Sequence, residues 1–325
     1  MKQFALYNPT TLAEAAELLG ADPPRTRLLA GGMDLLGRMK FRVDAPERVV
    51  NLKSIPGLDT IRETSEGLSL GPLVKLTDLA ESPIAQKNYR ALAQAAESVG
   101  SVPIRNSGTV GGNLCQHPRC WYYRHPDFPC LQKGGAICYA AQGGQNRYHA
   151  ILGGGPCFFA HPSDLAPAFI ALEASARLVG PKGERTVAVE KLYRLPMEQL
   201  GVGLALEPGE ILAEIRLPAP KPGNRSTYLK FKERPSFDFS LVGVAASLVL
   251  DGRKISAARL ALSGVAPVPW RATEAEKALV GSALDETTAR KVADVVVEGS
   301  VPLLHNRYKV SLTRTMVRRA LLSLV

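Results

Sequence analysis

Apolar residues recur along the chain with two periods, and the change between them predicts the order of helices and strands. The first twenty residues predict a strand followed by a helix, because Thr11 and Glu14 form a capping-box pattern ahead of an apolar run. Residues 83–99 carry Ala, Leu and Val on one face and predict a single amphipathic helix. Short apolar or alternating runs predict strands at 26–30, 48–52, 59–63 and 67–71.

The pattern changes after this helix. Residues 115–160 show no period and are rich in Gly, Pro and aromatic residues, and a loop of this length points to a function or a bound cofactor. A helix is predicted at 164–174, followed by short strands. The segment 218–226 has the composition of a domain linker. Beyond it, strands are predicted at 227–233, 241–250 and 255–264, and three helices complete the chain.

Length and composition agree with a folded protein of two or three domains. A chain of 325 residues exceeds what one core usually holds, and 46% hydrophobic with 22% charged residues is typical of globular proteins. The predicted fold class is α+β, with a unit up to about residue 218 and a smaller domain of antiparallel strands and helices after it. No run approaches the roughly 18 apolar residues of a membrane span, and the first residues lack the pattern of a secretory signal. We therefore expect a cytoplasmic protein, with export to the periplasm alongside a partner left open.

The chain is basic, with a formal net charge of +10 and a pI of about 9.4. This charge is compatible with an acidic partner, a nucleic acid or simply a soluble surface. Basic residues are dense only near the end, in RYKVSLTRTMVRRALLSL, where apolar residues recur at helical spacing. We expect a helix there that is either solvated or docked against another subunit.

Two pairs of glycines occur in LLAGGMDLL, directly after an apolar run, and in RNSGTVGGNL. Paired glycines let backbone N–H groups approach a diphosphate closely, although a tight turn explains each pair equally well. Asp34, Thr109 and Asn113 add a carboxylate, a hydroxyl and an amide beside the turns. Neither the dinucleotide fingerprint nor a Walker motif is present in the sequence.

Four of the five cysteines lie within residues 115–138, and Cys157 follows. Zinc sites use paired C-x₂₋₄-C spacings, and only Cys115 and Cys120 have such a spacing. An iron–sulfur cluster needs four thiolates, which single ligands on a long loop can supply. Five free thiols are the third interpretation, and spacing alone does not choose between zinc and iron–sulfur. Histidines in and beside this region are assigned no ligand role, namely His117, His125, His149 and His161.

Several motifs in register resemble one family along essentially the whole chain. LLAGGMDLL, IRNSGTVGGNL and HPSDLAPAFIALEA are followed in order by GEILAEIRLP, YLKFKERPSFDFSLVGVAASL and NRYKVSLTRTMVRRAL. Together they resemble the FAD-binding subunit of the xanthine dehydrogenase and carbon monoxide dehydrogenase family of molybdenum hydroxylases. The cysteine loop is similar to that of the members with an extra four-iron four-sulfur cluster, such as the β-subunit of 4-hydroxybenzoyl-CoA reductase.

The resemblance implies an FAD held by residues 1–218, in subdomains of about 1–55 and 56–218 with the iron–sulfur insertion at about 115–160, and a second flavoprotein domain at 222–325. The diphosphate would lie on both glycine turns. Asp164 would hydrogen-bond the cofactor, although by itself it is typical of a helix N-cap. Leu212 and Lys232 match positions along the flavin ring. The turns comprise Leu29, Ala30, Gly31, Gly32, Met33, Asp34 and Leu35, and Thr109, Val110, Gly111, Gly112 and Asn113.

For the cluster, the resemblance implies Cys120, Cys130, Cys138 and Cys157 as ligands and leaves Cys115 out. It also implies an oxidoreductase subunit that carries electrons and needs no catalytic acid, base or nucleophile of its own. Its partners would be a molybdopterin-binding large subunit, a small subunit with two two-iron two-sulfur clusters, and an external electron carrier such as a ferredoxin or NAD. Two alternatives remain: a basic zinc-binding nucleic-acid-binding protein, and a scaffold subunit that has lost its flavin.

Overall fold

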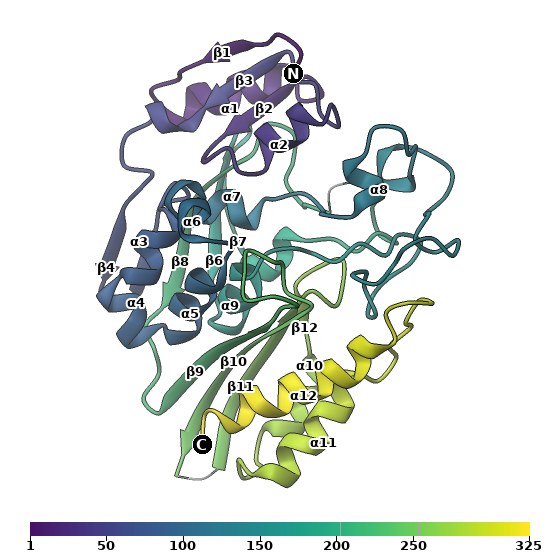
Figure 1. The fold of residues 1–325 in the computed structure, drawn as a ribbon. Coiled ribbons are helices and arrows are strands. Elements are labelled where there is room, and N and C mark those ends of the chain that lie inside the picture. The colour runs from purple at the N-terminus through teal and green to yellow at the C-terminus, as the bar shows by residue number, and fades with distance from the viewer. Residues whose placement is uncertain (202, 253) are drawn as a thin grey trace.

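A computed structural model of the chain describes residues 1–201, 203–252 and 254–325. The first unit is a small parallel sheet in the order β1 (Ala5–Tyr7), β3 (Arg48–Asn51) and β2 (Thr26–Leu29) (Figure 1). The connections are α1 (Leu12–Ala21), α2 (Leu35–Lys40) and the 3₁₀ turn η1 (Leu52–Ser54). The predicted cap of α1 is present, because the Thr11 hydroxyl accepts a hydrogen bond from the Glu14 N–H at 3.2 Å.

The second unit is a five-stranded antiparallel sheet. Its strands run in the order β4 (Ile61–Thr64), β5 (Gly67–Leu70), β8 (Ile211–Pro218), β6 (Ser175–Gly180) and β7 (Gly183–Ala188). Short helices lie against it, and two of them begin directly at the second glycine turn and at Asp164. The helical segments are α3 (Leu76–Glu81), α4 (Pro83–Asn88), α5 (Arg90–Ser98), α6 (Val102–Ser107), α7 (Val110–Leu114), α9 (Leu165–Ala171) and the 3₁₀ turn η3 (Val189–Leu192).

The single helix predicted over residues 83–99 is wrong, because the structure divides it into α4 and α5. Tyr89 interrupts the helix with φ −134° and ψ 50°. Its ring is buried, and its hydroxyl donates a hydrogen bond to the Pro218 carbonyl at 3.1 Å. Burial of this ring beside the end of β8 therefore overrides the uninterrupted helical period of the sequence.

The third unit is an antiparallel sheet in the order β12 (Trp270–Arg271), β11 (Lys254–Ser263), β10 (Val242–Asp251) and β9 (Asn224–Phe231). Helices α5 and α9 contact one face, while α10 (Thr273–Leu279) and α12 (Tyr308–Leu322) contact the other, with α11 (Glu286–Val296) packed on both helices (Figure 1). This arrangement confirms the α+β class with a smaller domain of antiparallel strands and helices.

The basic terminal helix α12 is already docked within its own chain. Met316, Val317 and Leu321 are buried against the third sheet, and Lys309 is fully buried. Two of its arginines form ion pairs with α11, namely Arg314 with Asp294 and Arg318 with Glu286. The apolar face is therefore not available to another subunit, which leaves only the arginine-bearing face for a partner.

The cysteine-rich region is loop-like, as its sequence predicts. Residues 115–160 contain only the short helix α8 (Trp121–Arg124) and the 3₁₀ turn η2 (Leu131–Lys133), and they project to one side of the molecule (Figure 1). Tyr122, Phe128 and Tyr139 contact one another with ring centroids 5.2–5.5 Å apart. No helix within the described residues is long and apolar enough to cross a membrane.

Candidate functional site

A cleft of about 440 Å³ lies where the first sheet, the second unit and strand β9 meet, and we call it the glycine cleft. Its walls include both glycine turns, Asp164, Lys230 and residues 237–239. The two turns touch, because a Cβ atom at Gly31 would collide with the Ser107 carbonyl oxygen. Gly32 adopts φ +78°, a conformation that few side chains tolerate. The structure thus brings together two sequence-distant turns through positions that only glycine can occupy.

Most of the residues expected at this site line the cleft. The exceptions are Leu29, Val110 and Lys232. Leu29 and Val110 face hydrophobic clusters instead, and Lys232 donates a hydrogen bond from its ammonium to the Ser236 carbonyl at 2.6 Å. The residues that do line the cleft are Ala30, Gly31, Gly32, Met33, Asp34, Leu35, Thr109, Gly111, Gly112, Asn113, Asp164 and Leu212.

Lys230 lines the cleft where Lys232 does not, and sequence reasoning missed it. Strand β9 ends at Phe231, so that Lys232 lies beyond the regular alternation of faces. Tyr228 and Lys230 are two residues apart on that strand and contact the same carboxylate. A period of two counted from Tyr228 selects Lys230 and Lys232 alike, and only the end of β9 at Phe231 separates the two lysines.

The two glycine turns differ in their backbone hydrogen bonds. In the second turn the N–H groups are used internally: Gly111 donates to the Pro72 carbonyl at 2.8 Å, and Gly112 donates to the Thr109 hydroxyl at 3.1 Å. In the first turn, no described residue accepts a hydrogen bond from the N–H groups of Gly31, Gly32, Met33 or Asp34. The first turn therefore offers free donors beside the cleft, which suits a bound anion.

Asp164 is the acidic residue expected from HPSDL, and its carboxylate is almost completely buried. It pairs with the Lys230 ammonium at 2.7 Å and accepts a hydrogen bond from the Tyr228 hydroxyl at 2.7 Å. Asp164 makes no capping hydrogen bond to α9, and the Ser163 hydroxyl accepts from the Ala166 N–H instead. Asp164 therefore occupies the N-cap position of α9, as the sequence predicts, but its side chain does not cap the helix, because the carboxylate is turned toward β9.

Asp34, in the first turn, is surrounded by arginines. Arg38 lies 3.1 Å away, while Arg119 and Arg124 of the cysteine loop lie 3.0 and 2.6 Å away. Burial on its own raises the pKa of Asp34, but Arg119, Arg124 and Arg38 outweigh it and lower the pKa to about 2. The carboxylate stays ionised and ties the first glycine turn to the start of the cysteine loop.

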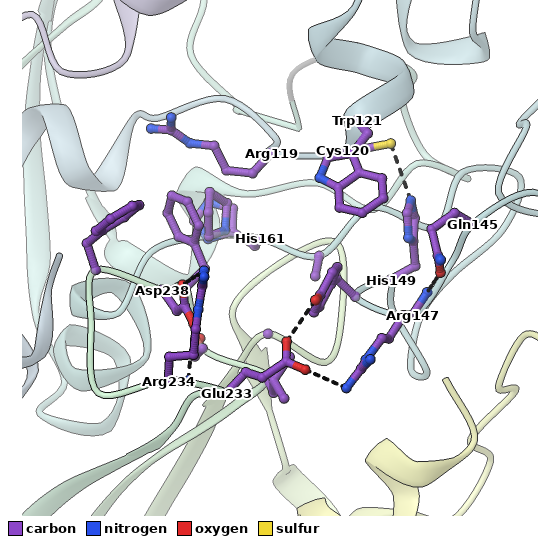
Figure 2. Close-up of a pocket in the computed structure, with 18 residues that line it drawn as sticks. Arg119, Cys120, Trp121, Gln145, Arg147, His149, His161, Glu233, Arg234 and Asp238 are labelled. Carbon is purple, nitrogen blue, oxygen red and sulfur yellow. Dashed lines mark hydrogen bonds and ion pairs between the residues drawn. The ribbon is translucent and has the colours of Figure 1, made fainter. Parts of the chain in front are cut away.

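A second pocket, of about 290 Å³, adjoins the glycine cleft and shares Arg119 and residues 237–239 with it. Figure 2 shows that Trp121, Cys120 and His149 line one side and that Glu233, Arg234 and Asp238 line another. Its acidic groups are paired with arginines, since Glu233 contacts Arg147 at 2.6 Å and Asp238 contacts Arg234 at 2.7 Å. We call it the aromatic pocket, because exposed rings of Trp121, Tyr148, Phe237 and Phe239 surround it.

Cys120, Cys130, Cys138 and Cys157 line one small cavity of the cysteine loop, which we call the cysteine pocket. Cys115 is not part of it and lines the glycine cleft, where burial raises the pKa of its thiol to about 12. Within the described part of the chain, no three His, Cys, Asp or Glu side chains are arranged to hold a single metal ion. The free volume between the four thiols is only about 10 Å³.

Three of these sulfurs, those of Cys120, Cys138 and Cys157, take part in hydrogen bonds with the backbone, and the last two also bond to each other. Backbone N–H groups of Tyr122 and Tyr123 contact Cys120, although burial, the larger effect, raises its pKa to about 11. The hydrogen bond with Cys157 lowers the pKa of Cys138 to about 6, and the same bond raises the pKa of Cys157. N–H groups directed at sulfur are a common feature of thiolate sites for metals and clusters.

His149 lies at the edge of the cysteine pocket, with its Nε2 atom 3.3 Å from the Cys120 sulfur. Burial and, next to it, the nearby Lys309 ammonium lower the pKa of His149 to about 4. Lys309 and Asn306 donate hydrogen bonds to the His149 carbonyl at 3.1 and 3.0 Å. Burial lowers the pKa of Lys309 to about 7. The C-terminal domain therefore fixes the backbone of the cysteine loop at this point.

Two family models match the chain. The FAD binding domain in molybdopterin dehydrogenase matches residues 2–220, and the CO dehydrogenase flavoprotein C-terminal domain matches residues 226–324. Among curated proteins, the aldehyde oxidoreductase FAD-binding subunit PaoB of Escherichia coli is 34% identical over 97% of this chain and 96% of its own. The carbon monoxide dehydrogenase medium chain of Hydrogenophaga pseudoflava is 30% identical over 98% of this chain and 96% of its own.

Solved structures give the same result. A chain of carbon monoxide dehydrogenase from Hydrogenophaga pseudoflava superposes with a TM-score of 0.78 at 30% identity, and covers 98% of this chain and 96% of its own. A chain of quinoline 2-oxidoreductase from Pseudomonas putida superposes with a TM-score of 0.76 at 26% identity and the same coverage. The likeness therefore extends over all three sheets.

Proposed function

The chain belongs to the family of FAD-binding subunits of molybdenum-containing dehydrogenases, and from this premise we propose that it carries electrons between an iron–sulfur partner subunit and an external acceptor or donor. The observation that supports this most is the glycine cleft, with free N–H donors on its first turn and a buried carboxylate on the opposite wall. FAD, when bound, exchanges electrons singly or in pairs and thereby connects partners of different kinds.

The cleft residues present suit this cofactor. The first turn, from Ala30 to Leu35, would hold the diphosphate through its free N–H groups, whereas the second turn would contribute shape and the Thr109 hydroxyl. Asp164 would accept a hydrogen bond from the cofactor while Lys230 and Tyr228 hold the carboxylate in place. Leu212 would provide an apolar wall.

We further propose that the cysteine pocket holds a four-iron four-sulfur cluster, as in the members that have an extra cluster. Four thiols around one cavity, with N–H groups directed at sulfur, match the ligand set of such a cluster. Zinc is supported less, because a tetrahedral site needs all four sulfurs about 2.3 Å from one ion and no such group exists among the described residues. A cluster exceeds this cavity of about 10 Å³, and binding would require the hydrogen-bonded thiols of Cys138 and Cys157 to separate.

The partners belong to the same proposal. The medium chain of carbon monoxide dehydrogenase is by its name one chain of a larger enzyme, and we propose a molybdopterin-binding large subunit and a small subunit with two-iron two-sulfur clusters for this chain. We place the complex in the cytoplasm. The division into domains 1–218 and 222–325 is proposed as well, and limited proteolysis should cut between Pro218 and Asn224, where the strands end and begin.

The decisive experiment is an anaerobic visible spectrum of the purified chain, with iron, acid-labile sulfide, zinc and released flavin quantified on the same sample. We expect one FAD and about four irons and four sulfides per chain. Flavin without iron would leave the flavoprotein intact and remove the cluster. Zinc without flavin would instead support the zinc-binding nucleic-acid-binding alternative and contradict the proposed function.

The external carrier is proposed to be an acidic redox protein such as a ferredoxin, because the chain has a net charge of +10. Electron transfer to such a carrier should slow markedly as the salt concentration rises, since screening weakens encounter between opposite charges. Stopped-flow rates at low and high ionic strength test this. Equal rates would exclude charge-driven docking, and NAD or another small acceptor would then be tested by the same assay.

A further inference from the structure

We propose that His149 raises the reduction potential of the cluster in the cysteine pocket by donating a hydrogen bond from its Nε2–H to the Cys120 sulfur. The inference rests on the proposed cluster and concerns how this chain tunes it. Nε2 lies 3.3 Å from that sulfur, within the distance of a hydrogen bond to sulfur, and Figure 2 shows the ring directed at it.

The charge of a ligating sulfur decides the direction of this hydrogen bond. Nδ1 of His149 is buried and has no hydrogen-bond partner in the described structure. Either tautomer of the neutral ring leaves this atom without a partner, so that the sulfur decides: a thiolate that ligates a cluster has no proton to donate and can only accept one. The proton belongs on Nε2, where the sulfur accepts it.

The ring is held in this position from two sides. Asn306 and Lys309 of the C-terminal domain donate to the His149 carbonyl, and its own N–H donates to the Asn146 carbonyl at 3.0 Å. Tyr122 contacts the ring with centroids 6.4 Å apart. All three hydrogen bonds involve the backbone of residue 149, so that substitution of the side chain leaves them intact.

A hydrogen bond to a ligating thiolate stabilises the more negative, reduced form of a cluster and raises its potential. Reduction adds one electron to the cluster, supplied in the experiment by dithionite. No bond forms or breaks, and the proton remains on Nε2. His149 is thus a positioning and tuning residue that acts through Cys120 and touches neither flavin nor substrate.

The test is a redox titration of the full chain, purified anaerobically with its cofactors, and followed by the electron paramagnetic resonance signal of the reduced cluster. His149→Phe and His149→Leu both remove the donor. In each variant we expect the ratio of reduced to oxidised cluster at a fixed ambient potential to fall about tenfold, which corresponds to about 59 mV for one electron. His125→Phe is the matched control, because His125 lies in the same loop with its side chain 56% exposed.

The outcomes separate this inference from the proposed function. A cluster present in both variants with an unchanged potential overturns the role of His149 and leaves the cluster in place. The absence of iron from the unchanged chain overturns the cluster and this inference with it. If one variant loses its iron, the potential of the other decides. An equal shift in His125→Phe would show a general effect of the loop and would also overturn the specific role of His149.

Discussion

The glycine cleft and the cysteine pocket both border the aromatic pocket, but their walls are stabilised in different ways. The cleft lies between regular strands and helices, and its walls are fixed by glycine contacts and by the buried pair of Asp164 and Lys230. The pocket lies in an irregular loop, where the thiols of Cys138 and Cys157 form a hydrogen bond and aromatic rings pack nearby. The cleft is therefore open and preformed, whereas the pocket contains little free space.

Because of this difference, the two sites differ in how much the protein would have to rearrange when a ligand binds. The N–H groups of the first glycine turn have no acceptor among the described residues and can bind an anion without breaking an existing hydrogen bond. In the cysteine loop, the ligand itself would supply much of the order, as metals do in small metal-dependent folds. Asp34 is the direct link between the sites, because its carboxylate binds Arg119 and Arg124 of the loop.

The largest effect is expected from removing a sulfur in the cysteine pocket. Cys157→Ser should lose most of the iron, because a cluster with three thiolates is labile, while the preformed cleft keeps its flavin. Cys115→Ser is the matched control and should keep its iron, since Cys115 lines the cleft. Iron and flavin are measured on the same sample. Loss of flavin together with iron in Cys157→Ser would show that the two sites form as one.

The second largest effect is expected on the stability of the folded chain when the buried ion pair of the cleft is broken. Asp164→Ala leaves the Lys230 ammonium buried without a counter-charge and should lower the free energy of unfolding by about 3–5 kcal/mol. Urea denaturation of the flavin-free chain measures this. Glu233→Ala breaks a pair whose side chains are 49% and 38% exposed and should leave the unfolding midpoint in place. Similar losses in the two variants would mean that the cleft is not held by its buried pair.

The third effect is the contribution of Asp34 to the pH dependence of the unfolding free energy. The folded pKa of Asp34, about 2, lies below its usual value of 3.8, so that its contribution is present above pH 4 and is lost as the pH falls toward 2. This lowering corresponds to about 2 kcal/mol. In Asp34→Asn, the loss of unfolding free energy between pH 4.5 and 2.5 should be smaller by roughly 1.5 kcal/mol, because the rest of the contribution is lost only below pH 2.5.

Asp127→Asn serves as the control for this measurement, because Asp127 is exposed in the same loop with its side chain 84% accessible. Its unfolding free energy should follow the same pH curve as the unchanged chain. If Asp34→Asn also retains that curve, the arginines around Asp34 do not stabilise the folded state through its charge, and the two sites are linked in some other way.

Sequence reasoning predicted most of the architecture, because periods of 2 and 3.6 reflect burial directly. Strands β10 and β11 and all three C-terminal helices lie where the pattern places them, whereas β9 (Asn224–Phe231) begins inside the predicted linker 218–226 and ends two residues before the predicted 233. The failure at Tyr89 has a tertiary cause, since the contact of its hydroxyl with Pro218 joins residues 129 positions apart and leaves no local signal. The burial of Lys309 beneath the cysteine loop is equally invisible in a segment that reads as a basic surface helix.

The same distinction between local sequence signals and tertiary contacts applies to the candidate site. Glycines and the acidic residue of HPSDL are found from the sequence, because backbone approach and buried charge need those residue types. The sequence treats both glycine turns alike, yet only the first has free N–H groups, because Pro72 and Thr109 accept those of the second. Likewise, the contact of His149 with Cys120 depends on how a loop without a period folds back over 29 residues.

The smallest effect is expected on FAD binding when Lys232 is replaced, in contrast to Lys230 on the same segment. Lys232→Ala should change the dissociation constant of FAD less than twofold, because its ammonium is satisfied by the Ser236 carbonyl outside the cleft. Lys230→Met removes a charged hydrogen bond that holds Asp164 in place, and should weaken FAD binding at least tenfold, or about 1.4 kcal/mol. Flavin fluorescence titration of the flavin-free chain measures both constants. If Lys232→Ala were the weaker binder, the flavin would lie beyond the end of β9, toward the aromatic pocket, and the cleft would hold only the rest of the cofactor.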